Sequence, residues 1–274
     1  MAKILLFLLA TAMLFGKTTL KFSQKTIHFS NSKQKKDAQH LRTTLNYKNN
    51  IHQIVASYSN ANVQTYQPPL HSNLHVNKYT VIYNNSYFKN QTCTLGYLYI
   101  DDNLAKEVDG GSIFTLGYRY KAVAFQQHIS VYHHFSVLQS DIFYNRGFNF
   151  STLKAVAIIG AKYIYLKNRK SNHFSANAKK DYLAPVLKFK LHYKKLQVQL
   201  GAVFGRRVFG VMNNALTVNH HAMEFYKTYI AGVAYRYNNL LLQLNYSYQE
   251  ADELPLNNQG VKLNAAGISL GYSF

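Results

Sequence analysis

The sequence predicts an all-β fold, an antiparallel β-barrel that crosses a membrane, and three observations predict it. The chain opens with an export signal, and apolar and polar residues then alternate along it with a period of two. Beyond the N-terminal segment, no stretch approaches the length of a membrane-spanning helix. A membrane protein without such helices satisfies its backbone hydrogen bonds only as a closed barrel.

The composition limits the kinds of protein that the chain can be. Its 274 residues suffice for one large β domain, and a chain with 47% hydrophobic residues is not intrinsically disordered. The formal net charge of +20 suits an anionic membrane surface or small anionic solutes. A nucleic-acid partner is not expected, because the lysines are spread along the chain and do not gather in one arm or motif.

Cysteine and cofactor chemistry are not expected either. Cys93 is the single cysteine, so neither a disulfide within the chain nor a cysteine-based metal cluster can form. It falls on the apolar face of its segment, where a buried or lipid-facing position is expected. The sequence has no Gly-rich phosphate-binding loop, and we predict no cofactor and no metal.

The first residues have the layout of a secretory signal peptide. A charge at Lys3 precedes a run of apolar or small residues over 4–15, and small residues around Ala12 supply a cleavage pattern. The run falls short of the roughly 20 residues of a membrane-spanning helix, although an uncleaved anchor is an alternative. We expect cleavage after Ala12 or near residue 16, which gives a signal peptide (1–16) and one barrel domain (17–274).

The alternation is clearest near the C-terminus. One face of a segment there carries Leu240, Leu242, Leu244, Tyr246 and Tyr248, and the other face carries Leu241, Gln243, Asn245, Ser247 and Gln249. A soluble β-sandwich also alternates. Here the apolar faces recur along the chain, about five residues long and often ending in Tyr, as in a lipid-facing band with aromatic girdles. The opposite faces are rich in Gly, Ser, Asn, Gln and Lys, which predicts a water-filled lumen.

Segment by segment, the alternation predicts fourteen strands. In chain order they are 18–29, 39–49, 51–60, 75–85, 91–101, 112–121, 123–132, 137–145, 151–166, 181–193, 195–206, 222–237, 239–249 and 260–274. The strand at 18–29 is needed to give an even number of strands, with both chain termini on the same side of the membrane. Its alternation is poor, because Leu20 and Phe22 differ in parity from Ile27 and Phe29, so twelve strands are the alternative.

The connections are expected to alternate in length. Tight polar turns occur at Asn49-Asn50, Lys194-Lys195 and Asn238-Asn239, and longer polar stretches lie near 31–38, 61–74, 102–111, 167–180, 208–219 and 250–259. In membrane barrels the short turns face the periplasm and the long loops lie outside.

The last residues, Ile268-Ser269-Leu270-Gly271-Tyr272-Ser273-Phe274, resemble the terminal strand of bacterial outer-membrane β-barrels. The resemblance is to a general, porin-like architecture over the whole mature chain and points to no specific family. It implies a location in the bacterial outer membrane, surrounded by outer-membrane lipid. It also implies recognition of Phe274, with Tyr272, Leu270 and Ile268, by the barrel assembly machinery.

The polar faces indicate a basic lumen. The predicted pore-lining residues are Arg42, Lys78, Arg119, Lys121, Lys154, Lys162, Lys188, Lys190, His192 and Arg236. Most acids are expected in the outer loops, and only Asp141 and Glu224 in strands. Because rings of Lys and Arg favour anions in a pore, we predict a small passive channel that favours small anionic solutes. A non-conducting structural or adhesion barrel is the alternative.

A lipid-hydrolysing barrel is a further alternative, based on His173 and Ser175. This pair resembles the His-x-Ser pair of outer-membrane phospholipase A and of lipid A 3-O-deacylases, in which the His activates a Ser nucleophile. The match is incomplete, because Ala176 replaces the Asn that follows Ser in those families, and Leu187 stands where they place the residue that orients the His. We therefore predict no catalytic residue.

His220, His221 and Glu224 form the other polar constellation. On a strand, His220 and Glu224 would share the lumen face about 13 Å apart, at roughly 3.3 Å per residue. His221 would then point outward. A metal ion needs donor atoms about 2 Å away, so a structural role near the barrel mouth is expected.

Overall fold

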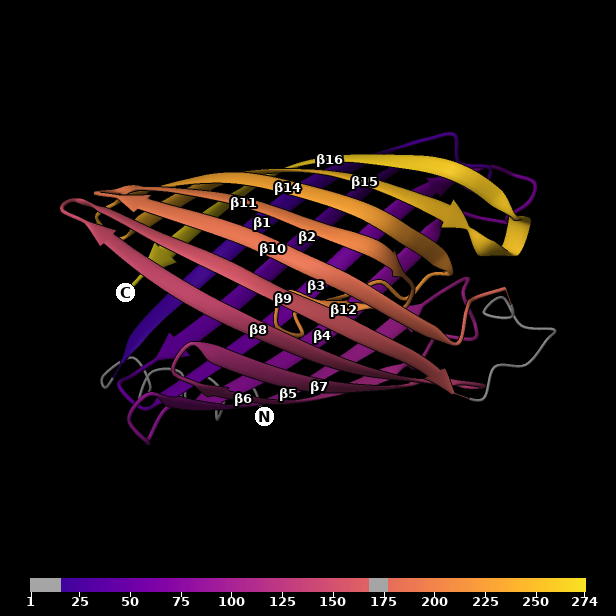
Figure 1. Cartoon of the computed structure of the whole chain (residues 1–274). Coiled ribbons are helices and arrows are strands. Elements are labelled where there is room, and N and C mark those ends of the chain that lie inside the picture. The colour runs from indigo at the N-terminus through magenta and orange to yellow at the C-terminus, as the bar shows by residue number, and fades with distance from the viewer. Residues whose placement is uncertain (1–15, 168–176) are drawn as a thin grey trace, which may run out of the picture.

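Fourteen antiparallel strands close into a single barrel in the computed structural model, which describes residues 16–167 and 177–274 (Figure 1). The wall strands are β1 (Lys17–Ser30), β2 (Lys35–Lys48), β3 (His52–Thr65), β4 (Leu74–Asn85), β5 (Gln91–Asp102), β6 (Ser112–Tyr120), β7 (Val123–Val131), β8 (Ser136–Phe150), β9 (Leu153–Lys167), β10 (Asp181–Tyr193), β11 (Leu196–Arg207), β14 (Met223–Tyr237), β15 (Leu240–Glu253) and β16 (Asn258–Ser273). Two short strands, β12 (Val211–Met212) and β13 (Thr217–Val218), pair only with each other, and η1 (Leu254–Leu256) is a single 3-10 turn. Within the described residues, no helix has the length and apolar character needed to cross a membrane.

The barrel closes between β1 and β16, which pair from Thr19–Ser273 to Ser30–Lys262. The predicted strand at 18–29 is therefore confirmed, and the twelve-stranded alternative is wrong. Its irregular alternation has a structural cause. Phe22 faces outward, whereas Ile27 and Phe29 face inward and belong to an apolar core inside the barrel.

The connections divide the barrel into a short-turn end and a long-loop end. Two-residue turns such as Lys194-Lys195 and Asn238-Asn239 lie at the short-turn end, where Lys194 and Asn238 have positive φ angles of 50° and 51°. At the long-loop end the strands run farther than predicted. The prediction stopped short because both faces are polar or both are apolar there, so the sequence no longer alternates. Five acids beyond the predicted strand bounds therefore lie in strand ends: Asp37, Asp102, Glu250, Asp252 and Glu253. Asp101 and Asp181, which were also counted with the loops, lie in strand ends at the predicted bounds.

The outer face is apolar and exposed, as a lipid-facing surface requires. Leu116 and Leu183 are each 61% exposed on it. Aromatic side chains neighbour one another across strands, with ring centroids 5.3 Å apart for Tyr58 and Tyr79. Cys93 is exposed on this face, in line with its predicted lipid-facing position. Phe274 is also exposed, and its recognition by the assembly machinery stays a prediction.

The inner face is predominantly polar toward the short-turn end. Toward the long-loop end the inward side chains form an apolar core that includes Val63, Leu74, Val76, Ile100, Ile113, Val137, Ile164, Tyr182, Val261 and Leu263. The expectation of a polar, water-filled interior throughout is therefore wrong for this half. The core exists because a chain segment enters the barrel and packs against the wall there.

Candidate lumen site and its inner loop

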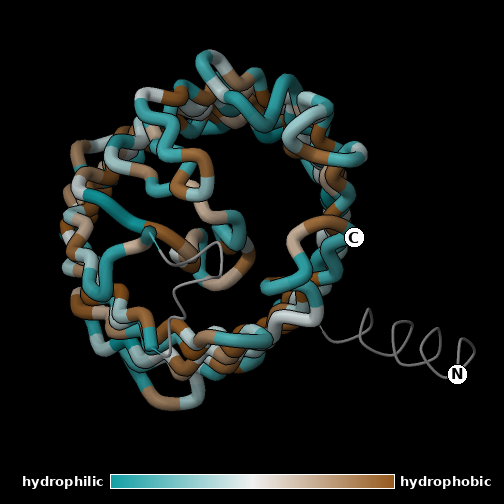
Figure 2. The backbone as a smooth tube through the Cα atoms, turned by 90° about the vertical axis from the view of Figure 1, so that its right-hand side faces the viewer, coloured by the Kyte–Doolittle hydropathy of each residue, from teal (hydrophilic) through white to brown (hydrophobic). Residues whose placement is uncertain are grey.

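The segment 208–222 between β11 and β14, here named the inner loop, lies inside the barrel. It was predicted as an outer loop, and its burial corrects that prediction: Val208 and Phe209 are 0% exposed. Strands β12 and β13 form a small hairpin within it, with Val211 paired to Val218. Viewed from the long-loop end, the barrel wall forms a ring into which chain segments fold (Figure 2).

A bulge at Gly205 precedes the inner loop. Gly205 has a φ of +81°, and a Cβ on it would lie 2.4 Å from the carbonyl oxygen of Leu183 on β10. Only glycine accepts both the backbone conformation and the close approach. The register between β11 and β14 shifts between Phe204 and Arg207, just before the chain leaves the wall.

Strands β8 and β9 hold the first half of the inner loop. Gln139 accepts a hydrogen bond from the amide of Val211 at 2.8 Å and donates one to the Val211 carbonyl at 2.9 Å. Lys162 donates to the same carbonyl at 3.1 Å and also forms an ion pair with buried Asp141. His128 lies on the other side of Asp141, with Nε2 3.5 Å from Oδ2. The Asp141 carboxylate and the Lys162 ammonium therefore neutralise each other.

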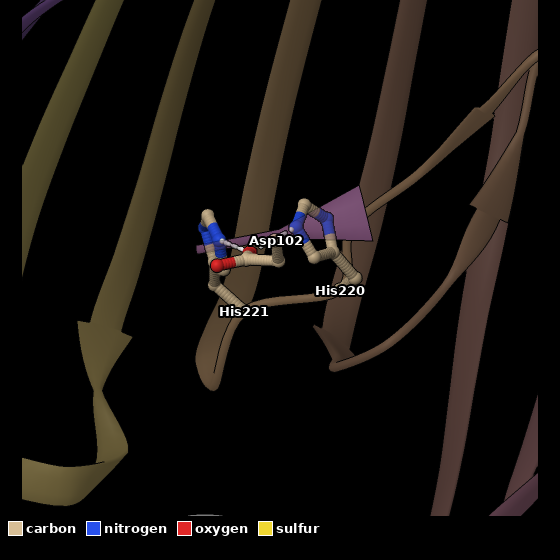
Figure 3. A group of neighbouring side chains, drawn as sticks. All are labelled: Asp102, His220 and His221. Atoms are coloured by element: carbon tan, nitrogen blue, oxygen red, sulfur yellow. Dashed lines mark hydrogen bonds and ion pairs between the residues drawn. The ribbon is translucent and has the colours of Figure 1, made fainter. Parts of the chain in front are cut away.

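Strands β4 and β5 hold the second half. Lys78 on β4 donates a hydrogen bond to the carbonyl of Val218 at 2.9 Å. At the end of β5, Oδ2 of Asp102 lies 2.9 Å from Nε2 of His220 and 3.0 Å from Nε2 of His221 (Figure 3). Oδ1 of Asp102 accepts hydrogen bonds from the backbone amides of Leu104 and Ala105, at 3.0 and 2.8 Å. The Asp102 carboxylate is thus fully hydrogen-bonded, and we call this cluster the latch.

The imidazoles of the latch are held neutral. Burial first, and the neighbouring ammonium of Lys35 next, lower the pKa of His221 to about 4, against the raising effect of Asp102. Burial is also the largest cause that lowers the pKa of His220. Each neutral ring can donate one Nε2–H to the carboxylate, which agrees with the arrangement of the three side chains.

The expected strand positions of His220 and His221 are wrong, because β14 begins only at Met223. Both histidines point to Asp102, and Glu224 instead forms an ion pair with Arg206. The donor atoms of Asp102, His220 and His221 lie within 4.8 Å of one another, close enough for a metal ion. Each of these atoms already has a hydrogen-bond partner, and the Lys35 ammonium lies 3.4 Å from Nδ1 of His221. The cluster is therefore best explained as a latch.

Two cavities lie inside the barrel. The short-turn cavity has a volume of about 760 Å³, and its lining includes Arg119, Lys188, Lys190, His192, and Asn213 of the inner loop. The inner-loop cavity has a volume of about 190 Å³ and lies between the inner loop and inward side chains of β1 to β4 and β14 to β16.

The structure places nine of the ten predicted pore-lining residues on the inner face by strand register. They are Arg42, Lys78, Arg119, Lys154, Lys162, Lys188, Lys190, His192 and Arg236. Lys121 is the exception, because β6 ends at Tyr120 and Lys121 lies in the following turn. Its ammonium is 5.0 Å from the centroid of the outward-facing Tyr120 ring. Lys78 and Lys162 additionally hold the inner loop, a role that the sequence did not indicate.

A cluster of four inward cations lies beside the inner-loop cavity, and sequence reasoning missed half of it. Arg42 and Lys78 were predicted to be in the lumen, whereas Lys21 and Lys25 on β1 were not. Their inward orientation could have been inferred from the sequence, because Lys21 and Lys25 alternate with the outward-facing Phe22 along the same strand. Among the described residues, no ion pair involves any of the four. Nε of Arg42 is buried and has no hydrogen-bond partner.

The alternative catalytic pair, His173 and Ser175, lies outside the described residues, as does the predicted signal peptide up to residue 15. The candidate site consists of the short-turn cavity and the inner-loop cavity, which both lie inside the barrel.

Together, the closed even-numbered barrel, its apolar outer face and its two classes of connection define the class of the chain: an outer-membrane β-barrel.

The chain is similar to several solved structures. A bacterial polysaccharide outer membrane secretin is similar at a TM-score of 0.53 and 7% identity, over 95% of this chain and 98% of that one. Pseudomonas aeruginosa OccK8 (OprE) is similar at a TM-score of 0.44 and 10% identity, over 94% of this chain and 98% of that one. No family model matches the chain, and no curated protein matches it in sequence.

Proposed function

We propose that the barrel is a passive channel that favours small anions, and that solutes pass between the inner loop and strands β1 to β4. The observation that supports this proposal most strongly is the cluster of Lys21, Lys25, Arg42 and Lys78 inside the barrel. Within residues 16–167 and 177–274, no carboxylate forms an ion pair with it. Inward cations lower the energy of an anion in a narrow pore and raise that of a cation.

The distribution of the acids supports this preference. Asp141 is paired with Lys162, and Asp102 is engaged by the two latch histidines. Glu253 accepts hydrogen bonds from Ser32 and from the backbone of Lys33 at the rim. These three buried carboxylates are therefore committed to holding loops and do not neutralise the cation cluster. The short-turn cavity adds further positive charge through Arg119, Lys188 and Lys190.

The test is a reversal potential in a planar bilayer under a KCl gradient. The wild-type channel is expected to be anion-selective, and replacing Lys25, Arg42 and Lys78 by Gln is expected to lower the chloride-to-potassium permeability ratio several-fold. Lys194→Gln is the control, because its ammonium lies outside the lumen, 5.4 Å from the Tyr193 ring. Cation selectivity of the wild-type channel would refute the proposal.

A non-conducting barrel is the second candidate, and the apolar core around the inner loop is the observation that favours it. Absence of single-channel conductance from folded protein would support that candidate. The lipid-hydrolysing candidate rests on His173 and Ser175, and a phospholipase assay in detergent with Ser175→Ala tests it.

A further inference from the structure

The inner-loop cavity has two chemically different sides, arranged in sequence along β1 and β2. Counted from the short-turn end, the inward cross-strand pairs are Lys21–Thr44, Ser23–Arg42, Lys25–His40 and Ile27–Ala38. The lining therefore changes from positively charged to apolar between the pair Lys25–His40 and the next inward pair, Ile27–Ala38. The apolar side continues across the wall with Val63 and Val76 and is completed by Phe29, Val218 and Phe225.

The charged side of the cavity favours the binding of an anionic group. Lys25, His40 and Lys78 line the cavity, and Arg42 lies one inward position from His40 on the same strand. Buried cations are costly unless an opposite charge or hydrogen-bond acceptors compensate them. Because no carboxylate of the described residues pairs with Lys25, Arg42 or Lys78, an anion entering the cavity would supply that compensation.

The apolar side selects against small hydrated ions. Chloride or phosphate gains nothing from contact with Ile27, Val63 or Phe225. Lys35 also lines this side, but the carboxylates of Asp102 and Glu253 already act on its charge and would repel a second negative charge on a ligand. At about 190 Å³ the cavity is smaller than the 300–1,000 Å³ typical of pockets for drug-sized ligands, so the ligand is small.

We propose that the inner-loop cavity binds a small organic monoanion with an apolar body. Its charged group lies among Lys25, Arg42 and Lys78, and its apolar body packs against Ile27, Ala38 and Val63. The inference rests on the proposed channel function, and it names the class of solute that the channel retains at this point. Ligands of this class carry one negative charge, either a carboxylate or a sulfonate, joined to an aromatic or branched aliphatic group.

The test uses the folded full-length protein in a planar bilayer, with benzoate as the probe added to KCl. Benzoate is expected to interrupt the chloride current in a concentration-dependent manner. Acetate, which lacks the apolar body, and benzamide, which lacks the charge, are expected to require at least tenfold higher concentrations. Benzenesulfonate, tested in parallel, distinguishes a preference for carboxylate from recognition of the charge alone.

A variant in the apolar side separates this inference from the channel proposal. Val63→Thr keeps the side-chain shape and adds a hydroxyl, so it is expected to weaken benzoate block by about fivefold or more, an effect that the channel proposal alone does not predict. Val203→Thr is the matched control, because Val203 is buried on β11 in a separate apolar cluster and does not line the cavity.

Each outcome decides one of the two proposals. An anion-selective channel that benzoate blocks no better than acetate or benzamide overturns the inference and leaves the channel function standing. Without conductance or anion selectivity the channel proposal fails. Calorimetric titration of the folded protein in detergent with benzoate then tests the cavity alone, and absence of saturable binding overturns the inference there too.

Discussion

Nε2 of His220 lies 2.9 Å from Oδ2 of Asp102, although 118 residues separate them in the chain. One residue ends a wall strand and the other belongs to the inner loop, so the contact fixes the position of the loop inside the barrel. His221 reaches the same oxygen at 3.0 Å. Two donors on one charged acceptor make this the strongest polar attachment of the second half of the loop.

Replacing Asp102 by Asn is expected to release that half of the loop. The substitution keeps the shape but removes the negative charge, and hydrogen bonds to charged groups contribute about 1.5–3 kcal/mol each. We expect larger and noisier single-channel conductance than in the wild-type protein. Asp101→Asn is the control, because Asp101 is exposed and lies outside the latch, where it accepts a hydrogen bond from Asn77. Identical conductance in the wild-type protein and Asp102→Asn would contradict the latch.

Acidification is expected to open the latch as well. The pKa of His221 is lowered from 6.5 to about 4 in the closed loop, by burial first and by Lys35 next. Protonation therefore favours the open loop, in which the imidazole regains its ordinary pKa. Closure is fully stable above pH 6.5 and loses stability as the pH falls toward 4. The loss reaches about 3 kcal/mol, since one pKa unit is worth about 1.4 kcal/mol.

The groups that face the latch allow this assignment to be checked. They are Asp102, Lys35 and Lys78. Conductance measured from pH 7 to pH 4 should rise in the wild-type protein and respond less in His221→Asn, which cannot take up a proton. A response of equal size in both proteins would assign the titration to other groups.

The wall was predictable because the membrane imposes a pattern on every strand. Lipid on one side and polar contents on the other make residues such as Leu240 and Gln243 alternate over the length of the span. The inner loop has no such pattern, and the contact between Asp102 and His220 cannot be inferred from one sequence. A signal for the internal core was nevertheless present. Leu98 and Ile100 alternate with Tyr97 and Tyr99, so both faces of that strand end are apolar.

The bulge before the inner loop gives a prediction about assembly. Gly205→Ala places a Cβ 2.4 Å from the carbonyl oxygen of Leu183, on a backbone with a φ of +81°. A left-handed conformation alone costs a residue with a side chain about 1–2 kcal/mol, and the clash adds to it. We expect less heat-modifiable, folded barrel on gels. Gly201→Ala on the same strand is the control, since its Cβ would meet no atom closer than 3.6 Å. Equal losses in both variants would exclude the bulge as the cause.

Neighbouring residues on β11 test which face meets lipid. Leu200 is exposed on the outer face, and Gln199 faces the lumen, where Nε2 lies 3.3 Å from Oδ1 of Asn245. Leu200→Arg is expected to lower the free energy of unfolding in lipid vesicles by about 2–4 kcal/mol, the cost of arginine near the middle of a bilayer. Gln199→Arg is expected to cost less, because its guanidinium enters the polar half of the lumen. The measurement is a reversible guanidinium titration of both variants in the same lipid. If Gln199→Arg proved the more destabilising, the assignment of the two faces would be reversed, and the cations assigned to the lumen would have to face the membrane.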